Sequence, residues 1–189
     1  MSEQLYKKIL LPTDGSKYSD ISEKHALSIA ATNNSEIIAL SVIENSFSIG
    51  LPDTDTISEV NRLLKEENEK NLKKVERLRD ECGVDVKIRT LVKEGSPARV
   101  ILETIDEEDI DLVVMGSSGK SGIDKFLMGS VAEKVVKSAK CSVLVVHWLH
   151  LIGVLNEGNR IWFGKQPIHK LPVLKVHHVC KGKCWKLVD

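Results

Sequence analysis

Short apolar runs alternate with longer segments of helical periodicity through the first 146 residues, and this alternation limits the fold more than any other feature. The apolar runs have the length of buried strands, at 7–12, 36–43, 84–92, 111–116 and 142–146. The segments between them predict helices at 17–33, 57–82, 97–106 and about 130–138. Strand–helix–strand connections of this length favour parallel pairing with a right-handed crossover. The sequence therefore predicts an α/β fold: a Rossmann-like, doubly wound, five-stranded parallel sheet with helices on both faces.

Residues that favour helix ends mark several of these boundaries. Ser96-Pro97 combines an N-cap residue with proline at the first helical position, and Gly83 suits the position that follows a helix. Two pairs have the spacing of a capping box, Thr56 with Glu59 and Ser130 with Glu133. We expect both pairs to cap the helices that they precede.

Composition argues against several classes of protein. The 27 basic and 27 acidic residues balance, so net charge favours neither nucleic acid nor a membrane surface. The longest apolar-rich run, 143–155, is shorter than the about 20 residues that a membrane-spanning helix needs. The start, MSEQLYKK, lacks the apolar core of a signal peptide, and four scattered cysteines do not indicate a disulfide framework. We expect a cytoplasmic protein with no nucleic-acid or membrane partner.

The chain divides near residue 147 into two segments of different composition. Residues 1–146 carry 20 basic and 25 acidic residues, whereas residues 147–189 carry 7 and 2. All three tryptophans and five of the six histidines lie in the second segment. We expect a complete α/β domain at 1–146 and an atypical, basic, Trp- and His-rich extension at 147–189, poorly ordered beyond about Leu155.

Three interpretations of this extension stay open. His177, His178, Cys180 and Cys184 are ligand types that suit Zn²⁺, but their spacing is a weak signal and we predict no metal site from it. The basic and aromatic residues are also typical of an arm that binds a partner. A shifted reading frame after the last strand would produce the same loss of acidic residues and gain of Trp, His and Cys.

The loop after the fourth apolar run contains Gly119-Lys120-Ser121, which are the last letters of a P-loop motif. A P-loop needs a first glycine five positions before Gly119, where this chain has Val114. The dinucleotide motif G-x-G-x-x-G fails as well, since residue 118 is serine. The likeness to a P-loop is therefore accidental.

A wider spacing remains in the same region: Gly116-x2-Gly119-x9-Gly129-Ser130. The first two glycines let the backbone approach a ligand and allow positive φ. Gly129-Ser130 lies where the next helix begins, and the free amides and partial positive charge of a helix start suit phosphate. The intervening residues can form a flap that brings Lys120 or Lys125 to an anion. The alternative is a glycine-bearing surface loop followed by an ordinary capped helix.

The segment PTDGS, at 12–16, follows the first apolar run. Ligands of doubly wound sheets bind outside the carboxyl ends of the strands, where the strand order reverses. The loops after the first and fourth strands should meet there. Asp14 is either a turn or capping carboxylate, or a ligand group that accepts a ribose hydroxyl or lies close to Mg²⁺. The pattern favours the binding of nucleotide phosphates between the two loops.

Five segments in order resemble the universal stress protein family: ILLPTDGS (9–16), GSPARVILE (95–103), DLVVMGSSG (111–119), GSVAEKVV (129–136) and CSVLVV (141–146). The resemblance covers about residues 5–146, and the glycine spacing is similar to that of the family's ATP-binding branch. It implies the strand order 3-2-1-4-5, and ATP with Mg²⁺ or Mn²⁺ in a cleft between the first and fourth strands. It also implies a homodimer through the last strand, 142–146, and a regulatory output linked to stress.

The resemblance implies nucleotide-binding residues at the matching positions. On the adenosine and ribose side they are Pro12, Thr13 and Asp14, with the backbone of Val42 at adenine. Around the ribose and phosphates they are Met115, Gly116, Gly119, Gly129, Ser130 and Val131, with Lys120 as an accessory to the phosphates.

The leading hypothesis is an ATP-binding universal stress protein that acts as a nucleotide-dependent regulatory switch in the stress response. One alternative is a slow or partner-activated ATPase; no catalytic residue is predicted, because none stands out as a general base for water. The other is a structural dimerisation module without a ligand, against which the three glycines argue.

Overall fold

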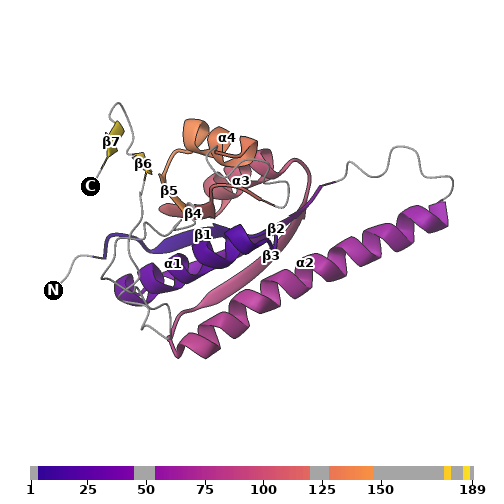
Figure 1. Cartoon of the computed structure of the whole chain (residues 1–189), viewed down its shortest axis with the longest axis horizontal. Helices are drawn as coiled ribbons and strands as arrows, with labels where there is room; N and C mark the ends of the chain where they lie inside the picture. The colour runs from indigo at the N-terminus through magenta and orange to yellow at the C-terminus, as the bar shows by residue number, and fades with distance from the viewer. Residues whose placement is uncertain (1–3, 45–53, 120–127, 147–176, 180–184, 188–189) are drawn as a thin grey trace, which may run out of the picture.

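The computed structural model describes residues 4–44, 54–119, 128–146, 177–179 and 185–187. Strands and helices alternate through the described residues up to Val146 (Figure 1). The elements are β1 (Lys8–Pro12), α1 (Lys17–Asn33), β2 (Glu36–Ile43), α2 (Thr54–Cys82), β3 (Ile88–Glu94), α3 (Pro97–Glu107), β4 (Leu112–Gly116), α4 (Ser130–Ser138), β5 (Ser142–Val146), β6 (His177–Val179) and β7 (Trp185–Leu187).

The described strands form one sheet in the order β3-β2-β1-β4-β5-β6-β7. The first five strands pair in parallel, which confirms the predicted doubly wound topology and the order 3-2-1-4-5. β6 and β7 extend the sheet beyond β5 with antiparallel pairing. These two strands belong to the extension in which we expected little order, and the rest of the extension lies outside the described residues.

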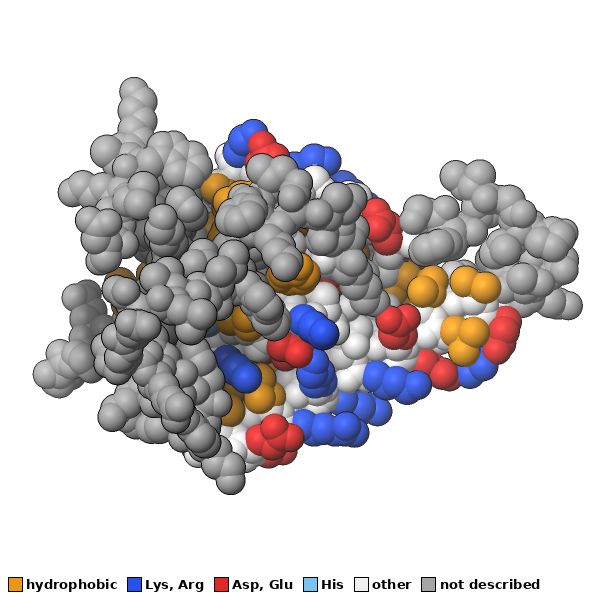
Figure 2. Space-filling view, viewed as in Figure 1, with side chains coloured by type: hydrophobic (Ala, Val, Ile, Leu, Met, Phe, Trp, Pro, Cys, Tyr) orange, Lys and Arg blue, Asp and Glu red, His pale blue; other side chains and the backbone are white. Residues whose placement is uncertain are grey.

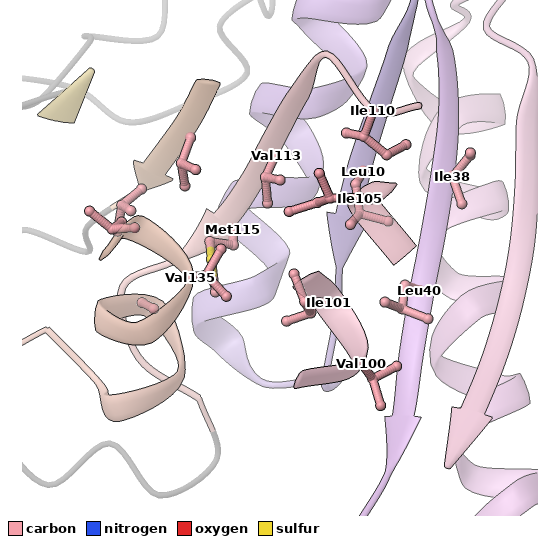
Figure 3. Packing of buried hydrophobic residues seen from close by; sticks show 14 residues of the cluster. Leu10, Ile38, Leu40, Val100, Ile101, Ile105, Ile110, Val113, Met115 and Val135 are labelled. Atoms are coloured by element: carbon pink, nitrogen blue, oxygen red, sulfur yellow. The ribbon is translucent and has the colours of Figure 1, made fainter. Parts of the chain in front are cut away.

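Helices cover both faces of the sheet, and each face has its own buried cluster. Successive residues of β1 point to opposite faces, so Ile9 and Leu11 join the cluster under α1 and α2, whereas Leu10 joins the other. Figure 3 shows that second cluster, where Ile101 of α3 and Val135 of α4 lie against the strands. Burial on both faces explains why the central strands are continuous apolar runs rather than alternating ones.

Several predicted helix ends agree with the structure. Ser16 caps α1 by accepting a hydrogen bond from the Ser19 amide. Ser96 is the N-cap of α3 with Pro97 after it, although its side chain makes no capping hydrogen bond. Gly83 follows α2 with a φ of 62°, a left-handed conformation that favours glycine.

Three boundary predictions are wrong. β3 begins at Ile88 rather than at residue 84, because the alternating pattern starts before the residues that pair with β2. α2 begins at Thr54, so Thr56 lies inside the helix and cannot cap it. Gly129 rather than Ser130 is the N-cap of α4, so the second capping box is absent as well.

The outer surface of α2 carries charges of both signs, as Figure 2 shows along the length of this helix. Arg62 pairs with Glu59 and Glu66 at helical spacing, and each of these side chains is about half exposed. Exposed pairs of this kind contribute little, roughly 0–1 kcal/mol. α2 is therefore held to the domain by its apolar side, not by these charges.

Truncation of Leu10 tests the importance of this double-sided burial. Leu10 is fully buried, so Leu10→Ala should lower the free energy of unfolding by about 2–5 kcal/mol through lost transfer energy and a cavity. Leu63→Ala on α2 is the control, because Leu63 is 50% exposed and its truncation should change stability by less than about 0.5 kcal/mol. Urea denaturation measures both. Equal effects of the two substitutions would contradict the described core.

Candidate functional site

β1 and β4 are neighbours in the sheet, and their connections leave in opposite directions. They pair at Ile9 with Leu112 and at Leu10 with Val113. β1 connects through α1 to β2 on one side, whereas β4 connects through α4 to β5 on the other. This is the switch point at which open α/β sheets bind ligands.

The residues after β1 form a tight turn into α1. The Thr13 amide donates to Leu40 O at 2.9 Å, and Gly15 takes a φ of 74°, which favours glycine. Asp14 Oδ1 accepts a hydrogen bond from the Ser16 amide at 3.0 Å. The turn thus orients the Asp14 carboxylate, so a role in the turn and a role toward a ligand are compatible.

α2 supports this turn through two asparagines that the sequence did not single out. Asn71 Nδ2 donates to Asp14 O at 3.4 Å, and a Cβ on Gly15 would lie 2.3 Å from Asn71 Oδ1. Asn68 Oδ1 accepts a hydrogen bond from Ser41 Oγ, which also lies 3.1 Å from Thr13 O. The sequence does not reveal the role of these two residues, because asparagine within a charged helix normally indicates only a solvated surface.

Gly116 and Gly119 allow the loop after β4 to pack closely against the first turn. A Cβ on Gly116 would lie 3.1 Å from the backbone oxygen of Tyr18, and one on Gly119 would lie 2.6 Å from Asp14 Oδ2. The two predicted loops therefore meet at Asp14 and Gly119. Neither glycine adopts the positive φ that glycine allows; close approach is what requires glycine there.

α4 begins beside the same loop. The Gly129 amide donates to Ser117 O at 2.7 Å, and a Cβ on Gly129 would lie 3.2 Å from that oxygen. Its N-cap, Gly129, has no side chain to cap the helix, and the amides of its first turn, Ser130 to Ala132, have no partner within the helix. Such a start favours negative charge, because its N–H groups and the helix dipole point to the same place.

The remaining predicted residues occupy the same edge but have different surroundings. β2 stops pairing with β1 at Leu40, yet it continues along β3 through Val42, which leaves Val42 beyond the end of β1. Met115 is 5% exposed and belongs to the buried cluster between the sheet and helices α3 and α4, against which Val131 also packs. Contacts of these two residues to a ligand would therefore come from their backbones. Lys120 and Lys125 lie outside the described residues.

Glu23 of α1 is a further acidic residue near this edge, and no sequence pattern indicates its role. Its side chain is fully buried, and Oε1 accepts a hydrogen bond from Thr13 Oγ1 at 2.8 Å. Burial raises the pKa of Glu23, and the hydrogen bond from Thr13 opposes that rise only in part. A glutamate in a helix is usually solvated, so only the structure reveals this one.

Other features do not add a site within the described part of the chain. No group of three or more His, Cys, Asp or Glu residues there is arranged to hold a metal ion. The His and Cys residues at 177–184, from which we predict no metal site, fall outside the side chains that the structure describes. No helix in the described ranges has the length and apolar character needed to cross a membrane. A hollow of about 390 Å³ between α3 and α4 includes Arg99, which is already paired with Glu103.

Known proteins resemble the domain that contains this edge. The model of the universal stress protein family matches residues 5–147. The chain belongs to the universal stress protein family. Universal stress protein MJ0531 of Methanocaldococcus jannaschii is 46% identical over 144 residues, which cover 76% of this chain and 84% of that protein. These matches leave most of the extension without a counterpart.

Solved structures share the fold of this family member. The structure of MJ0577, also from M. jannaschii, superimposes with a TM-score of 0.68 at 30% identity, covering 77% of this chain and 99% of that one. The crystal structure of a universal stress protein in complex with cAMP superimposes with a TM-score of 0.56 at 28% identity, covering 76% and 98%. The family fold therefore extends over the whole candidate site.

The raised pKa of Glu23 predicts a pH dependence of stability. Folded protein holds the Glu23 proton more tightly than unfolded protein does. The stabilisation that this proton gives to the folded state is therefore fully present below the ordinary glutamate pKa. That contribution is lost as the pH rises through the raised pKa of the folded state. Glu23→Gln cannot titrate, so its free energy of unfolding relative to wild type should increase over this pH range. Denaturation of both proteins at several pH values measures the difference; a constant difference would contradict the prediction.

Proposed function

We propose that this universal stress protein binds ATP, with Mg²⁺ or Mn²⁺, at the switch point between β1 and β4. The start of α4 is the observation that carries the proposal. Its N-cap residue, Gly129, has no side chain that could cap the first turn, and a Cβ on Gly129 would lie 3.5 Å from Ser118 Cα, in the loop that reaches Asp14. A polyphosphate supplies the negative charge that such a helix start stabilises.

The two loops would hold different parts of the nucleotide. We assign adenosine and ribose to Pro12, Thr13, Asp14 and the backbone of Val42. We assign ribose and phosphates to Met115, Gly116, Gly119, Gly129, Ser130 and Val131, with Lys120 as an accessory. The backbone positions of Gly119 and Gly129 support this assignment, because a Cβ at either would crowd the space beside Asp14 or Ser117.

Asp14 has two roles open to it in this assignment. Its Oδ1 accepts from the Ser16 amide, and its Oδ2 faces Gly119 across the two loops. A carboxylate oxygen there can accept a hydrogen bond from a ribose hydroxyl. It can also lie close to Mg²⁺, which prefers oxygen ligands and is commonly held by carboxylates together with substrate phosphates.

The relative solved with cAMP supports an adenine nucleotide as the ligand. We favour ATP over a cyclic monophosphate, because the start of α4 lies beside the loop that reaches Asp14 and favours negative charge. The several phosphates of ATP carry more negative charge to that position than one cyclic phosphate does. Competition between ATP, ADP and cAMP would rank the three ligands.

A regulatory switch is the function that we propose for this binding. Among the described residues near the switch point, Asp14 is assigned to the ribose or Mg²⁺, and Glu23 is buried against Thr13. Neither is offered to an attacking water as a general base would be. Slow or partner-activated ATP hydrolysis is the alternative. We place the protein in the cytoplasm, on the composition of the chain.

Binding of Mg²⁺–ATP, measured by isothermal titration calorimetry, tests the proposal. Gly129→Val should weaken binding by about tenfold or more, which corresponds to ~1.4 kcal/mol, because its Cβ pushes the start of α4 from Ser117. Gly83→Asn is the control, since a Cβ there meets open space and asparagine tolerates its left-handed φ. Absence of binding by folded wild-type protein would refute the function; equal affinity of the two variants would refute the assigned phosphate position.

We also propose a homodimer through β5, which can form only where the chain's own extension does not occupy the edge of that strand. β6 pairs with β5 at Leu144 and Val145, so the edge that a second copy would use carries the chain's own extension. A strand edge has one row of free N–H and C=O groups, and two strands cannot occupy it together.

Removal of the extension therefore tests the dimer. The segment that the family shares ends at residue 147, so a chain of residues 1–150 retains the whole family domain. Light scattering after size-exclusion chromatography should give a dimer for residues 1–150 and a larger monomer fraction for the full chain at equal concentration. A monomer at 1–150 would rule out the β5 dimer.

A further inference from the structure

Glu23 occupies a position on α1 where an apolar side chain would be expected. It is 0% exposed, and its helix neighbours Ala26 and Leu27 are fully buried as well. Its Oε1 accepts one hydrogen bond, from Thr13, whereas Oε2 is buried without a hydrogen-bond partner among the described residues. Burying a carboxyl group that is only partly hydrogen-bonded is unfavourable, and buried polar groups of this kind need an explanation.

The hydrogen bond from Thr13 connects Glu23 to the candidate site. Thr13 Oγ1 accepts from the Gly15 amide at 3.3 Å and donates to Glu23 Oε1 at 2.8 Å. Because the hydroxyl hydrogen points to Glu23, the oxygen lone pairs remain available to Gly15. The three groups thus form one directed chain from the left-handed glycine of the turn to the interior of the domain.

Thr13 has other anchors that do not depend on Glu23. Its amide donates to Leu40 O, and its carbonyl oxygen lies 3.1 Å from Ser41 Oγ. Loss of the Glu23 carboxyl would therefore leave the Thr13 backbone attached to the sheet. The Thr13 hydroxyl would then be free to rotate. The Gly15 amide, which donates to that hydroxyl and so fixes the backbone between Asp14 and Gly15, would lose a positioned acceptor.

We propose that Glu23 is a positioning residue for the nucleotide site: through Thr13 Oγ1 it fixes the turn that presents Asp14 to Gly119 and to the ligand. The inference rests on the proposed function for its ligand. The charged groups near Glu23 are Asp20 on its own helix, Lys74 of α2 and Asp14 in the turn. Lys74 pairs with Asp20, so the direct partner of Glu23 is the Thr13 hydroxyl.

The comparison of Glu23→Leu with Glu23→Gln tests this role. Leucine fills the space but accepts no hydrogen bond, so it should raise the dissociation constant for Mg²⁺–ATP by about 2- to 10-fold, the worth of one net hydrogen bond. Glutamine retains an acceptor oxygen and should restore most of the affinity. Thr13→Val completes a double-mutant cycle, in which Glu23→Leu should have little further effect once the hydroxyl is gone.

The Gly15 amide gives a readout that does not need a nucleotide. Its hydrogen exchange, followed by NMR in the ligand-free protein, should be at least several-fold faster in Glu23→Leu than in Glu23→Gln. The Gly83 amide, which donates to Asp80 O, is the matched control and should not change. Unchanged exchange at Gly15, or equal affinity of the Leu and Gln variants, overturns the inference.

This pair of measurements separates the inference from the proposed function. If wild-type protein binds no nucleotide but Gly15 exchange still responds to Glu23→Leu, the ligand assignment fails and the support of the turn by Glu23 stands. If nucleotide binds and neither Gly15 exchange nor affinity responds, the function stands and Glu23 is only a core residue. Additive effects in the double-mutant cycle also overturn the inference, because they would separate Glu23 from Thr13.

Discussion

The burial of β1 on both faces is the constraint on which the rest of the domain depends. Ile9, Leu10 and Leu11 are fully buried and alternate between the two clusters, so the sheet must be covered by helices on each side. β1 also pairs with β2 on one edge and β4 on the other. A central strand with neighbours on both edges and helices on both faces is uncovered only at its ends, and open α/β sheets bind ligands at the carboxyl end. The turn at Thr13 and Asp14 is located there for that reason.

The turn is held more firmly than a surface loop needs. Groups from the sheet, α1 and α2 all reach it, and one of them, Glu23, is an acid buried with incomplete hydrogen bonding. Local departures from good packing or full hydrogen bonding are expected where a fold serves a ligand rather than its own stability. On the other side of the site, the loop after β4 and the start of α4 approach this edge through glycines, Gly119 and Gly129, which have no side chains. An arrangement of one fixed carboxylate beside the start of a helix suits a ligand that has both hydroxyl and phosphate groups.

Much of this could be predicted from the sequence, and the parts that could not have physical reasons. The apolar runs gave the strands, because burial on both faces leaves a pattern that does not depend on partners far along the chain. The glycine spacing and Asp14 gave the two loops of the site. The prediction that Ser130 caps α4 was wrong, because capping-box spacing cannot reveal that Gly129 takes the N-cap position. Glu23, Asn68 and Asn71 were missed, since their roles come from tertiary contacts to Thr13, Asp14 and Ser41, which no local pattern encodes. The pairing of β6 with β5 likewise joins segments about thirty residues apart.

Native mass spectrometry of the freshly purified full chain tests the central claim most directly, because it detects nucleotide that the protein carries from the cell. If the switch point binds ATP, one population should exceed the mass of the 21.0 kDa chain by one adenine nucleotide per protomer. That population should lose the added mass on denaturation and regain it with added Mg²⁺–ATP. A folded protein that carries no nucleotide and gains none in excess Mg²⁺–ATP would contradict the account.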